Sequence, residues 1–207
     1  MGWGDDDGPV APGTKLDGEN ALHQAHRLTI LIHEALAQPD AFHLSAATIC
    51  ELNKYAVDGA SPVAGHLGER SDLEIFGSRH VLPSHETVPQ LLDEACDYVH
   101  AHWTDDPVFL AAYVVWRLCW IHPFEDGNGR TARAASYLVL SVRLGFELPG
   151  ILPIPARIKF APIAYMRALE AADAAWSRNI LDVSELQKLL AFYLDAQLTD
   201  APPSLPP

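Results

Sequence analysis

The chain has 207 residues, of which 49% are hydrophobic, so it is long and apolar enough to fold around a single core and too apolar to be intrinsically disordered. Its formal net charge of −13 argues against nucleic acid and against anionic membranes as partners, because both bind clustered Lys and Arg side chains. A small anionic ligand stays compatible with this charge, since it needs only a few local cations.

The cysteine content and the two ends of the chain indicate where the protein works. Cys50, Cys96 and Cys119 are an odd number scattered in apolar stretches, so neither a disulfide framework nor a thiolate zinc site is expected. The N-terminus is acidic and lacks the apolar run of a signal peptide. The longest apolar run, Pro107–Ile121, carries Arg117 and is too short for a membrane span. We therefore expect a cytoplasmic protein.

Helical periodicity runs through one domain, residues 17–199, between a flexible lead-in at 1–16 and a Pro-rich tail at 200–207. The first expected helix carries apolar residues at helical spacing and ends before Pro39. Its apolar positions are Leu22, Ala25, Leu28, Leu31, Ile32 and Leu36. Ser45 is expected to cap a second helix that ends before Gly59.

Five further helices are expected beyond a short irregular region. A capping-box pattern from Thr87 to Gln90 predicts a third helix to about His102, and Asp106-Pro107 predicts the N-terminus of a fourth. The last three are expected at about 129–144, ending at a Gly, then at 159–176 and 183–198. Residues 72–82 instead resemble two short strands around a Gly-Ser turn, and such a hairpin either has a separate function or is a connector.

The segment from His122 to Arg133 concentrates polar residues between two strongly apolar helices. Gly127 and Gly129 flank Asn128, a residue that tolerates left-handed backbone angles. Such a turn points successive N–H groups inward as an anion-binding nest, and it opens into a helix N-terminus, which also favours an anion. The alternative is an ordinary turn at the start of a helix.

Two arginines follow in the first turn of the helix after this loop. Arg130 and Arg133 share one face by their spacing, and cations at this end oppose the helix dipole. A bound polyphosphate offsets that cost and accepts forked hydrogen bonds from both guanidinium groups. The competing interpretation is a pair of surface arginines bridged to local carboxylates.

Asp126 and His122 supply the remaining chemistry of the segment. One carboxylate with phosphate oxygens and waters is the usual way Mg²⁺ is held at a nucleotide site, but Asp126 is equally suited to a turn or a helix cap. His122 ends the apolar helix, where a neutral imidazole near the phosphates can accept a proton from an attacking hydroxyl, or can be purely structural. The segment therefore predicts an enzyme that handles nucleotide phosphates.

Residues 122–133 resemble the signature of Fic-domain proteins, His-x-Phe-x-(Asp or Glu)-Gly-Asn-Gly-Arg-x-x-Arg, and every specified position is filled. The hairpin resembles the family's flap, and the stretch from Tyr165 to Asp173 resembles a helix common after the motif. The resemblance implies an all-α Fic fold, a helical bundle with a short β-hairpin flap at about residues 71–82 before the active-site helix pair.

The resemblance also implies an activity, that of a protein adenylyltransferase, a nucleotidyltransferase that transfers AMP from ATP-Mg to a Ser, Thr or Tyr hydroxyl of a target protein. By this analogy His122 is the general base and Asp126 binds Mg²⁺. The residues that it implies for phosphate binding are Gly127, Asn128, Gly129, Arg130 and Arg133. The flap would hold the target chain as an added strand.

Two other functions stay open at this point. One is transfer of a different phosphate-containing group, although a phosphorylating relative departs from Gly-Asn-Gly-Arg, which this chain keeps. The other is a regulatory nucleotide-binding module that an antitoxin-like partner restrains. The sequence predicts no particular oligomeric state.

Regulation is a further point on which the chain departs from many relatives. Many family members carry an inhibitory helix with the pattern (Ser or Thr)-x-x-x-Glu-(Gly or Asn), whose Glu pairs with the second arginine of the motif. The nearest stretch here, Gly13 to Gly18, has Gly at the first position and Asp17 in place of the Glu. Asp17 or its rival Glu19 would then pair with Arg133, unless the stretch is simply an acidic turn with a helix cap.

Overall fold

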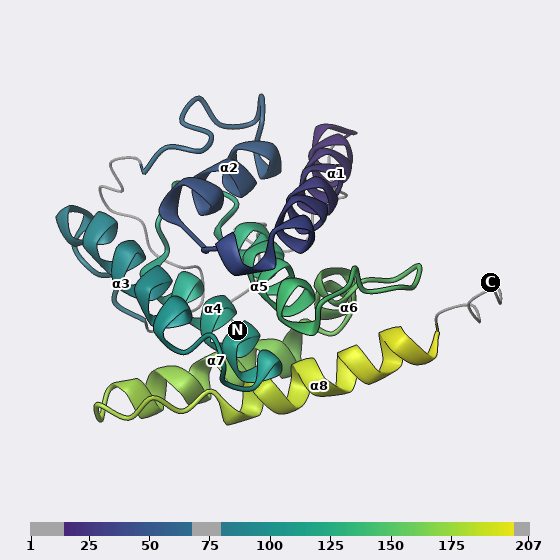
Figure 1. The fold of residues 1–207 in the computed structure, drawn as a ribbon. Coiled ribbons are helices and arrows are strands. Elements are labelled where there is room, and N and C mark those ends of the chain that lie inside the picture. Colours follow the sequence, from purple (N-terminus) through teal and green to yellow (C-terminus); the bar gives the residue numbers. More distant parts are fainter. Residues whose placement is uncertain (1–14, 68–79, 201–207) are drawn as a thin grey trace, which may run out of the picture.

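The computed structural model describes residues 15–67 and 80–200, and all regular structure within these two ranges is helical (Figure 1). The predicted all-α class is confirmed for them. The α-helices in chain order are α1 (Lys15–Ala37), α2 (Ala46–Ala56), α3 (Val88–Ala101), α4 (Pro107–Ile121), α5 (Asn128–Leu144), α6 (Ile154–Phe160), α7 (Pro162–Trp176) and α8 (Ser184–Thr199). Two short 3-10 helices, η1 (Pro39–Ala41) and η2 (His85–Thr87), precede α2 and α3.

Helices α4 and α5 form the central pair of the bundle, and the other helices pack around them (Figure 1). Helices α1 and α2 pack against α5, while α3 and α8 pack against α4. Both central helices are buried over most of their length, because their sequences are apolar or small on nearly every side. Since each large apolar side chain that is fully buried stabilises the fold by about 1.5–3 kcal/mol, the loop between α4 and α5 starts and ends on the most firmly held part of the molecule.

Several helix ends form as the sequence predicts. The hydroxyl of Ser45 accepts a hydrogen bond from the Thr48 N–H at 3.1 Å. The Asp106 carboxylate accepts one from the Phe109 N–H at 2.8 Å, with a proline in the first turn. Gly145 ends α5 in a left-handed conformation with φ 82°. These caps are local, so the residues beside each end suffice to specify them.

The predicted capping box at Thr87 is wrong. The Thr87 hydroxyl donates backward to the Ser84 carbonyl at 2.7 Å and accepts no cap hydrogen bond from α3. The 3-10 turn η2 fills these positions, and α3 begins only at Val88. The hydroxyl thus satisfies a turn in place of a helix end, as Thr side chains often do.

The helix expected at about 159–176 is α7, but its expected first residues fall in a separate helix, α6, which was not predicted. Helix α6 ends at Phe160 and α7 begins at Pro162, with Ala161 between them at φ −131° and ψ 59°. Pro162 lacks an N–H and disfavours the helical conformation at the residue before it, so the chain breaks there. A continuous helix was therefore the wrong interpretation of this apolar pattern.

The face that α1 buries differs from the predicted one in its first half. Leu22 is 71% exposed and Ala25 is exposed, whereas Asn20 and Gln24 are buried. Their side-chain amides donate to the carbonyl oxygens of Asp58 and Leu52, at 2.9 and 3.0 Å. In its first half α1 is therefore oriented by polar contacts with α2 and the residues just after it, whereas the predicted positions Leu28 and Ile32 are buried in its second half.

The two predicted tails and the flap are described only in part. Helix α1 begins at Lys15, so the last two residues of the predicted lead-in and the last four of the stretch from Gly13 to Gly18 are helical. Residues 68–79, which hold most of the predicted hairpin, lie outside the described residues, as do 1–14 and 201–207. The described end of the hairpin, His80 to Leu82, is not in a strand. No helix in the described ranges is long and apolar enough to cross a bilayer.

Candidate active site

The segment predicted as the site joins the two central helices. His122 ends α4, is 7% exposed and lies in the left-handed region at φ 51° and ψ 62°. Its N–H still donates to the Leu118 carbonyl at 2.9 Å, so the turn follows directly on the last helical hydrogen bond. Pro123 disfavours continuation of the helix, and the left-handed turn redirects the chain across the end of α4. His122 is thus held in a buried, fixed position.

Phe124 and Asn128 close the loop. The Phe124 side chain is 1% exposed and anchors the loop in the core. The Asn128 amide accepts from the Phe124 N–H at 2.9 Å and donates to the Phe124 carbonyl at 2.8 Å. Asn128 is itself the first residue of α5 and is not left-handed, contrary to the predicted turn. Because its side chain is engaged by the backbone of Phe124, only its backbone N–H is available to an anion.

Gly127 is the left-handed residue of the loop, with φ 75°. A Cβ at this position would lie 2.7 Å from Cγ1 of Val57 and 3.1 Å from Nδ2 of Asn53. Glycine is therefore required for both backbone conformation and space. Gly129 follows in the first turn of α5.

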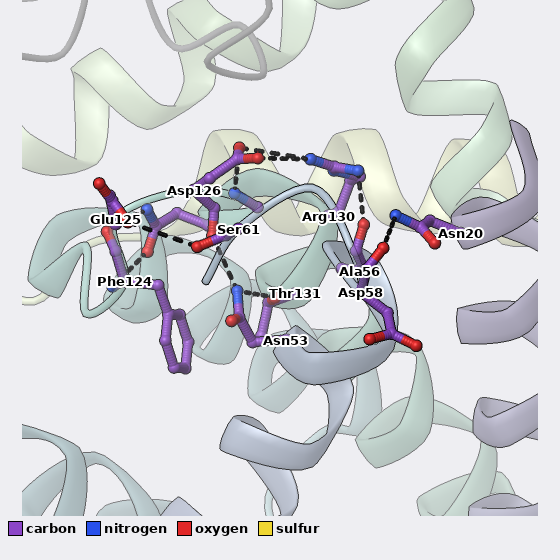
Figure 2. Close-up of polar contacts among 12 residues, drawn as sticks. Asn20, Asn53, Ala56, Asp58, Ser61, Phe124, Glu125, Asp126, Arg130 and Thr131 are labelled. Carbon is purple, nitrogen blue, oxygen red and sulfur yellow. Dashed lines mark hydrogen bonds and ion pairs between the residues drawn. The ribbon is translucent and has the colours of Figure 1, made fainter. Parts of the chain in front are cut away.

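The donors expected to bind phosphate converge on a carboxylate of the chain itself. The Gly127 N–H donates to the Asp126 carboxylate, and Nη2 of Arg130 lies 3.3 Å from both of its oxygens. Nη1 of Arg130 donates to the Ala56 carbonyl at 2.6 Å, which ties the guanidinium to the end of α2 (Figure 2). The Asp126 carboxylate is thus an anionic group at the junction of loop and helix. Arg130 therefore pairs with a local carboxylate, as in the alternative interpretation of the two arginines.

The Arg130–Asp126 pair is weak enough to be replaced by a ligand. It joins residues one helical turn apart, and the carboxylate side chain is 36% exposed. Such pairs contribute about 0.3–0.5 kcal/mol. Arg133, in contrast, is 7% exposed and is not a surface arginine, so that alternative does not hold for it.

Two residues of this region were not predicted from the sequence. Asn53 of α2 is 1% exposed and donates to the Asp126 carbonyl at 2.8 Å. His80 donates through Nε2 to the Trp120 carbonyl oxygen at 2.8 Å. Asn53 could have been noticed in the sequence as a polar residue on the apolar face of its helix, beside Ile49 and Leu52.

His80 lies close enough to His122 for the charge of His122 to affect the pKa of His80. Burial lowers the pKa of His80, the hydrogen bond to the Trp120 carbonyl acts in the opposite direction, and the charge of a protonated His122 lowers it further. The centre of its ring lies 5.3 Å from that of Trp120, with the two ring planes tilted by 48°. The end of the predicted flap is therefore held beside the histidine of the site.

Comparison with known proteins gives the family. Residues 43–140 match the model of the Fic/DOC family. Protein adenylyltransferase fic-1 of Caenorhabditis elegans is 29% identical over 155 residues, which are 74% of this chain and 30% of that protein. Protein adenylyltransferase Fic of Drosophila willistoni is 29% identical over 196 residues, 94% of this chain and 37% of that protein. The chain spans about a third of the length of these relatives.

Solved structures share the fold. The chain aligns with Fic-1 (aa134–508) of C. elegans at a TM-score of 0.66 and 25% identity, covering 92% of this chain and 52% of that one. A Fic domain containing signaling protein from Bacteroides thetaiotaomicron aligns at a TM-score of 0.71 and 24% identity, covering 92% and 74%. Residues 43–140 therefore match a Fic/DOC domain, and the described chain has the fold of Fic proteins.

Proposed function

We propose that this chain is a protein adenylyltransferase that transfers AMP from ATP to a Ser, Thr or Tyr hydroxyl of a target protein. The relatives named above carry that activity in their names and match most of this chain. The observation that carries the proposal is the junction of α4 and α5, where a buried histidine ends one helix and a set of anion-directed donors begins the next.

The transfer requires one proton acceptor and one leaving group. The target hydroxyl oxygen attacks the α-phosphorus of ATP, and its proton passes to the imidazole of His122 as general base. The bond from the α-phosphorus to the bridging oxygen breaks, and pyrophosphate leaves. Since phosphoryl chemistry of this kind depends mainly on positioning and charge stabilisation, the fixed backbone at His122 contributes directly to it.

The phosphates are assigned to the start of α5. The backbone N–H groups of Gly127, Asn128 and Gly129 and the positive end of the helix dipole form the anion hole. Arg130 and Arg133 add charged donors one turn apart. The Asp126 carboxylate, which accepts from Gly127 and Arg130, supports the assignment because it is an anion on the same donors.

Mg²⁺ is assigned to Asp126. No group of three or more His, Cys, Asp or Glu side chains within residues 15–67 and 80–200 is arranged to hold a metal ion. A single, partly exposed carboxylate fits an ion that takes its other ligands from phosphate and water. When bound, Mg²⁺ neutralises charge on the phosphates.

The partners proposed for this site are proteins. A target would present its hydroxyl along the flap at about residues 71–82, paired as an added strand. An antitoxin-like protein that supplies a glutamate to Arg133 is the proposed partner for inhibition. A cytoplasmic location would give the enzyme both ATP and intracellular targets.

The deciding experiment incubates the protein and a cell lysate with Mg²⁺ and ATP labelled on either the α- or the γ-phosphate. Label from the α-phosphate alone is expected, with no label when His122→Ala replaces the parent. Label from the γ-phosphate alone would mean phosphorylation, and a different labelled mass on the target would mean transfer of another group. Bound ATP without any transfer would identify a regulatory nucleotide-binding module.

A further inference from the structure

Asn53 of α2 connects its own helix to the stretch that follows α2 and to the loop before α5. Its amide nitrogen donates to the Asp126 carbonyl at 2.8 Å and to the Thr131 hydroxyl at 3.3 Å. Its amide oxygen accepts from the Gly65 N–H at 2.9 Å. Figure 2 shows the contacts with Asp126 and Thr131. The side chain is 1% exposed, so all three contacts are shielded from water.

The contact with Asp126 bears directly on the anion hole. The Asp126 carbonyl and the Gly127 N–H belong to one planar peptide unit and point in opposite directions. Because Asn53 holds the carbonyl on its own side, the N–H is directed away from α2, where it donates to the Asp126 carboxylate. Asn53 therefore determines the direction of the first backbone donor of the loop.

The contact with Gly65 links the same side chain to the stretch after α2. Gly65 has φ 75°, and a Cβ there would lie 2.8 Å from Cβ of Lys54 and 2.9 Å from the carbonyl oxygen of Cys50. This stretch is thus packed tightly on α2. Ser61 also donates to the Glu125 carboxylate at 3.3 Å, a second contact between this stretch and the loop.

We propose that Asn53 is a positioning residue that sets the affinity of the site for nucleotide phosphates by fixing the Asp126–Gly127 peptide. The inference rests on the proposed function only in taking ATP as the ligand. Asn53 touches no reacting atom, and it acts through the backbone of the loop. Its loss should free the peptide to rotate, so that binding of ATP must first restore the orientation of the Gly127 N–H.

Gln24 provides a matched control. It is also a buried amide that donates to a backbone carbonyl of α2, that of Leu52, at 3.0 Å. It belongs to α1, and this hydrogen bond is with α2 and not with the loop. Gln24→Ala therefore removes a comparable hydrogen bond at the residue next to Asn53, without removing a contact of Asp126.

The first test measures ATP binding with Mg²⁺ by calorimetry, together with thermal unfolding and amide hydrogen exchange over residues 127–131. For Asn53→Ala we expect about tenfold weaker ATP binding, which corresponds to about 1.4 kcal/mol, and faster exchange of those amides. For Gln24→Ala we expect a similar loss of thermal stability with ATP binding and exchange close to the parent. Equal losses of affinity in both variants, or parental affinity in Asn53→Ala, would overturn the proposal.

Asn53→Asp gives a second test through its pH profile. The new carboxylate keeps an acceptor for Gly65 but has no donor for Asp126, whereas protonation restores an O–H donor. The ATP affinity of Asn53→Asp should thus recover, relative to that of Asn53→Ala, as the pH falls. A ratio of the two affinities that stays constant with pH would count against the proposal.

The proposed function is judged separately. If AMP is transferred but ATP binding does not depend on Asn53, only this inference is overturned. If ATP binding depends on Asn53 but no AMP is transferred, only the proposed function is overturned.

Discussion

Single residues of the loop divide into those that hold it and those that are left to act on a ligand. Asn128 and Phe124 hold it, since the Asn128 amide is engaged twice by the backbone of Phe124. His122 contributes its ring from a fixed left-handed turn, and Asp126 contributes a partly exposed carboxylate. Three substitutions test this division.

His122→Ala should lower the rate of AMP transfer by about 10²- to 10⁴-fold, the usual effect of removing a general base. ATP affinity should stay close to that of the parent, because the ring is not among the proposed phosphate donors. Transfer rates and calorimetric ATP binding measure the two effects. His122→Asn is the control for backbone conformation, since Asn tolerates the left-handed region, and full activity in either variant would contradict the assignment.

Asp126→Ala should weaken Mg²⁺-dependent binding of ATP and should lower transfer. The carboxylate is the proposed protein ligand of the ion, and its removal also frees Arg130 from its 3.3 Å pair. A Mg²⁺ titration of ATP binding checks this. Glu125→Ala is the matched control, because the neighbouring carboxylate is exposed and accepts from Ser61. Identical titrations for the parent and Asp126→Ala would rule out Asp126 as the ligand.

Gly127→Ala should destabilise the fold by about 2–4 kcal/mol. About 1–2 kcal/mol comes from a left-handed alanine, and the rest comes from a Cβ placed 2.7 Å from Val57. Urea unfolding measures the change. Gly59→Ala separates the two causes, since Gly59 is also left-handed at φ 68° but has open space around its Cβ. If both variants lose the same free energy of unfolding, the contact of the new Cβ with Val57 does not destabilise the fold.

At the scale of the elements, the orientation of α1 determines which of its acidic residues faces α2 and which faces solvent. The helix turns Asn20 and Gln24 toward α2, and Asp17 shares that face by helical spacing. Glu19 instead pairs with Lys15 at 3.5 Å, and both side chains are largely exposed. The geometry of α1 favours Asp17 over Glu19 as an inhibitory residue.

Asp17→Asn is accordingly expected to raise self-modification with ATP, whereas Glu19→Gln should leave it unchanged. The reason is that an inhibitory carboxylate would compete with phosphate for Arg133, and amide substitution removes its charge. Mass spectrometry of the protein after incubation with ATP and Mg²⁺ gives the measurement. A deletion of residues 1–18 shows whether the whole end restrains the enzyme. Unchanged modification in all three would leave inhibition to a separate partner that supplies a glutamate.

At the scale of the molecule, an aromatic cluster joins α4 to α7 behind the site. The guanidinium of Arg117 lies 4.6 Å from the ring centre of Trp120, 5.2 Å from that of Trp176 and 5.8 Å from that of Trp116. The indole N–H of Trp116 donates to the carboxylate of Asp173 at 2.9 Å. Helix α4, which ends at His122, is therefore held against α7 by polar as well as aromatic contacts.

Asp173 should make the stability of the whole fold depend on pH. Burial raises its pKa from 3.8 to about 6, the Trp116 hydrogen bond acts in the opposite direction, and Glu170 raises it further. The folded state thus holds a proton that the unfolded state releases, so this contribution is complete below pH 3.8 and is lost as the pH rises toward 6.

Asp173→Asn should remove this dependence, because the amide does not titrate. Between about pH 4 and pH 7 the parent should lose about 1 kcal/mol relative to the variant, a value reduced by solvent screening of the partly exposed carboxyl. Urea unfolding of both proteins across that range gives the comparison. Parallel pH profiles would show that Asp173 does not carry the effect.

The sequence by itself determined the helices whose ends are set by neighbouring residues. Ser45, Asp106 and Gly145 specify their caps within a few positions, and the loop from His122 to Arg133 is specified by contiguous residues. It also carries the Fic signature at residues 122–133, which is readable because the motif is contiguous. The break before Pro162 was readable in the same local way and was missed because the apolar pattern runs through it.

Only the tertiary structure decided what surrounds that loop. Asn53 and Asp126 are 73 positions apart, and Arg130 and Ala56 are 74 apart, yet each pair is joined by a hydrogen bond. The burial of Asn20 and the exposure of Leu22 on α1 likewise accompany a hydrogen bond from Asn20 to the Asp58 carbonyl, just after α2. The physical reason is that a side-chain amide has no periodicity of its own: its partner is whichever backbone group the packed helices bring within reach.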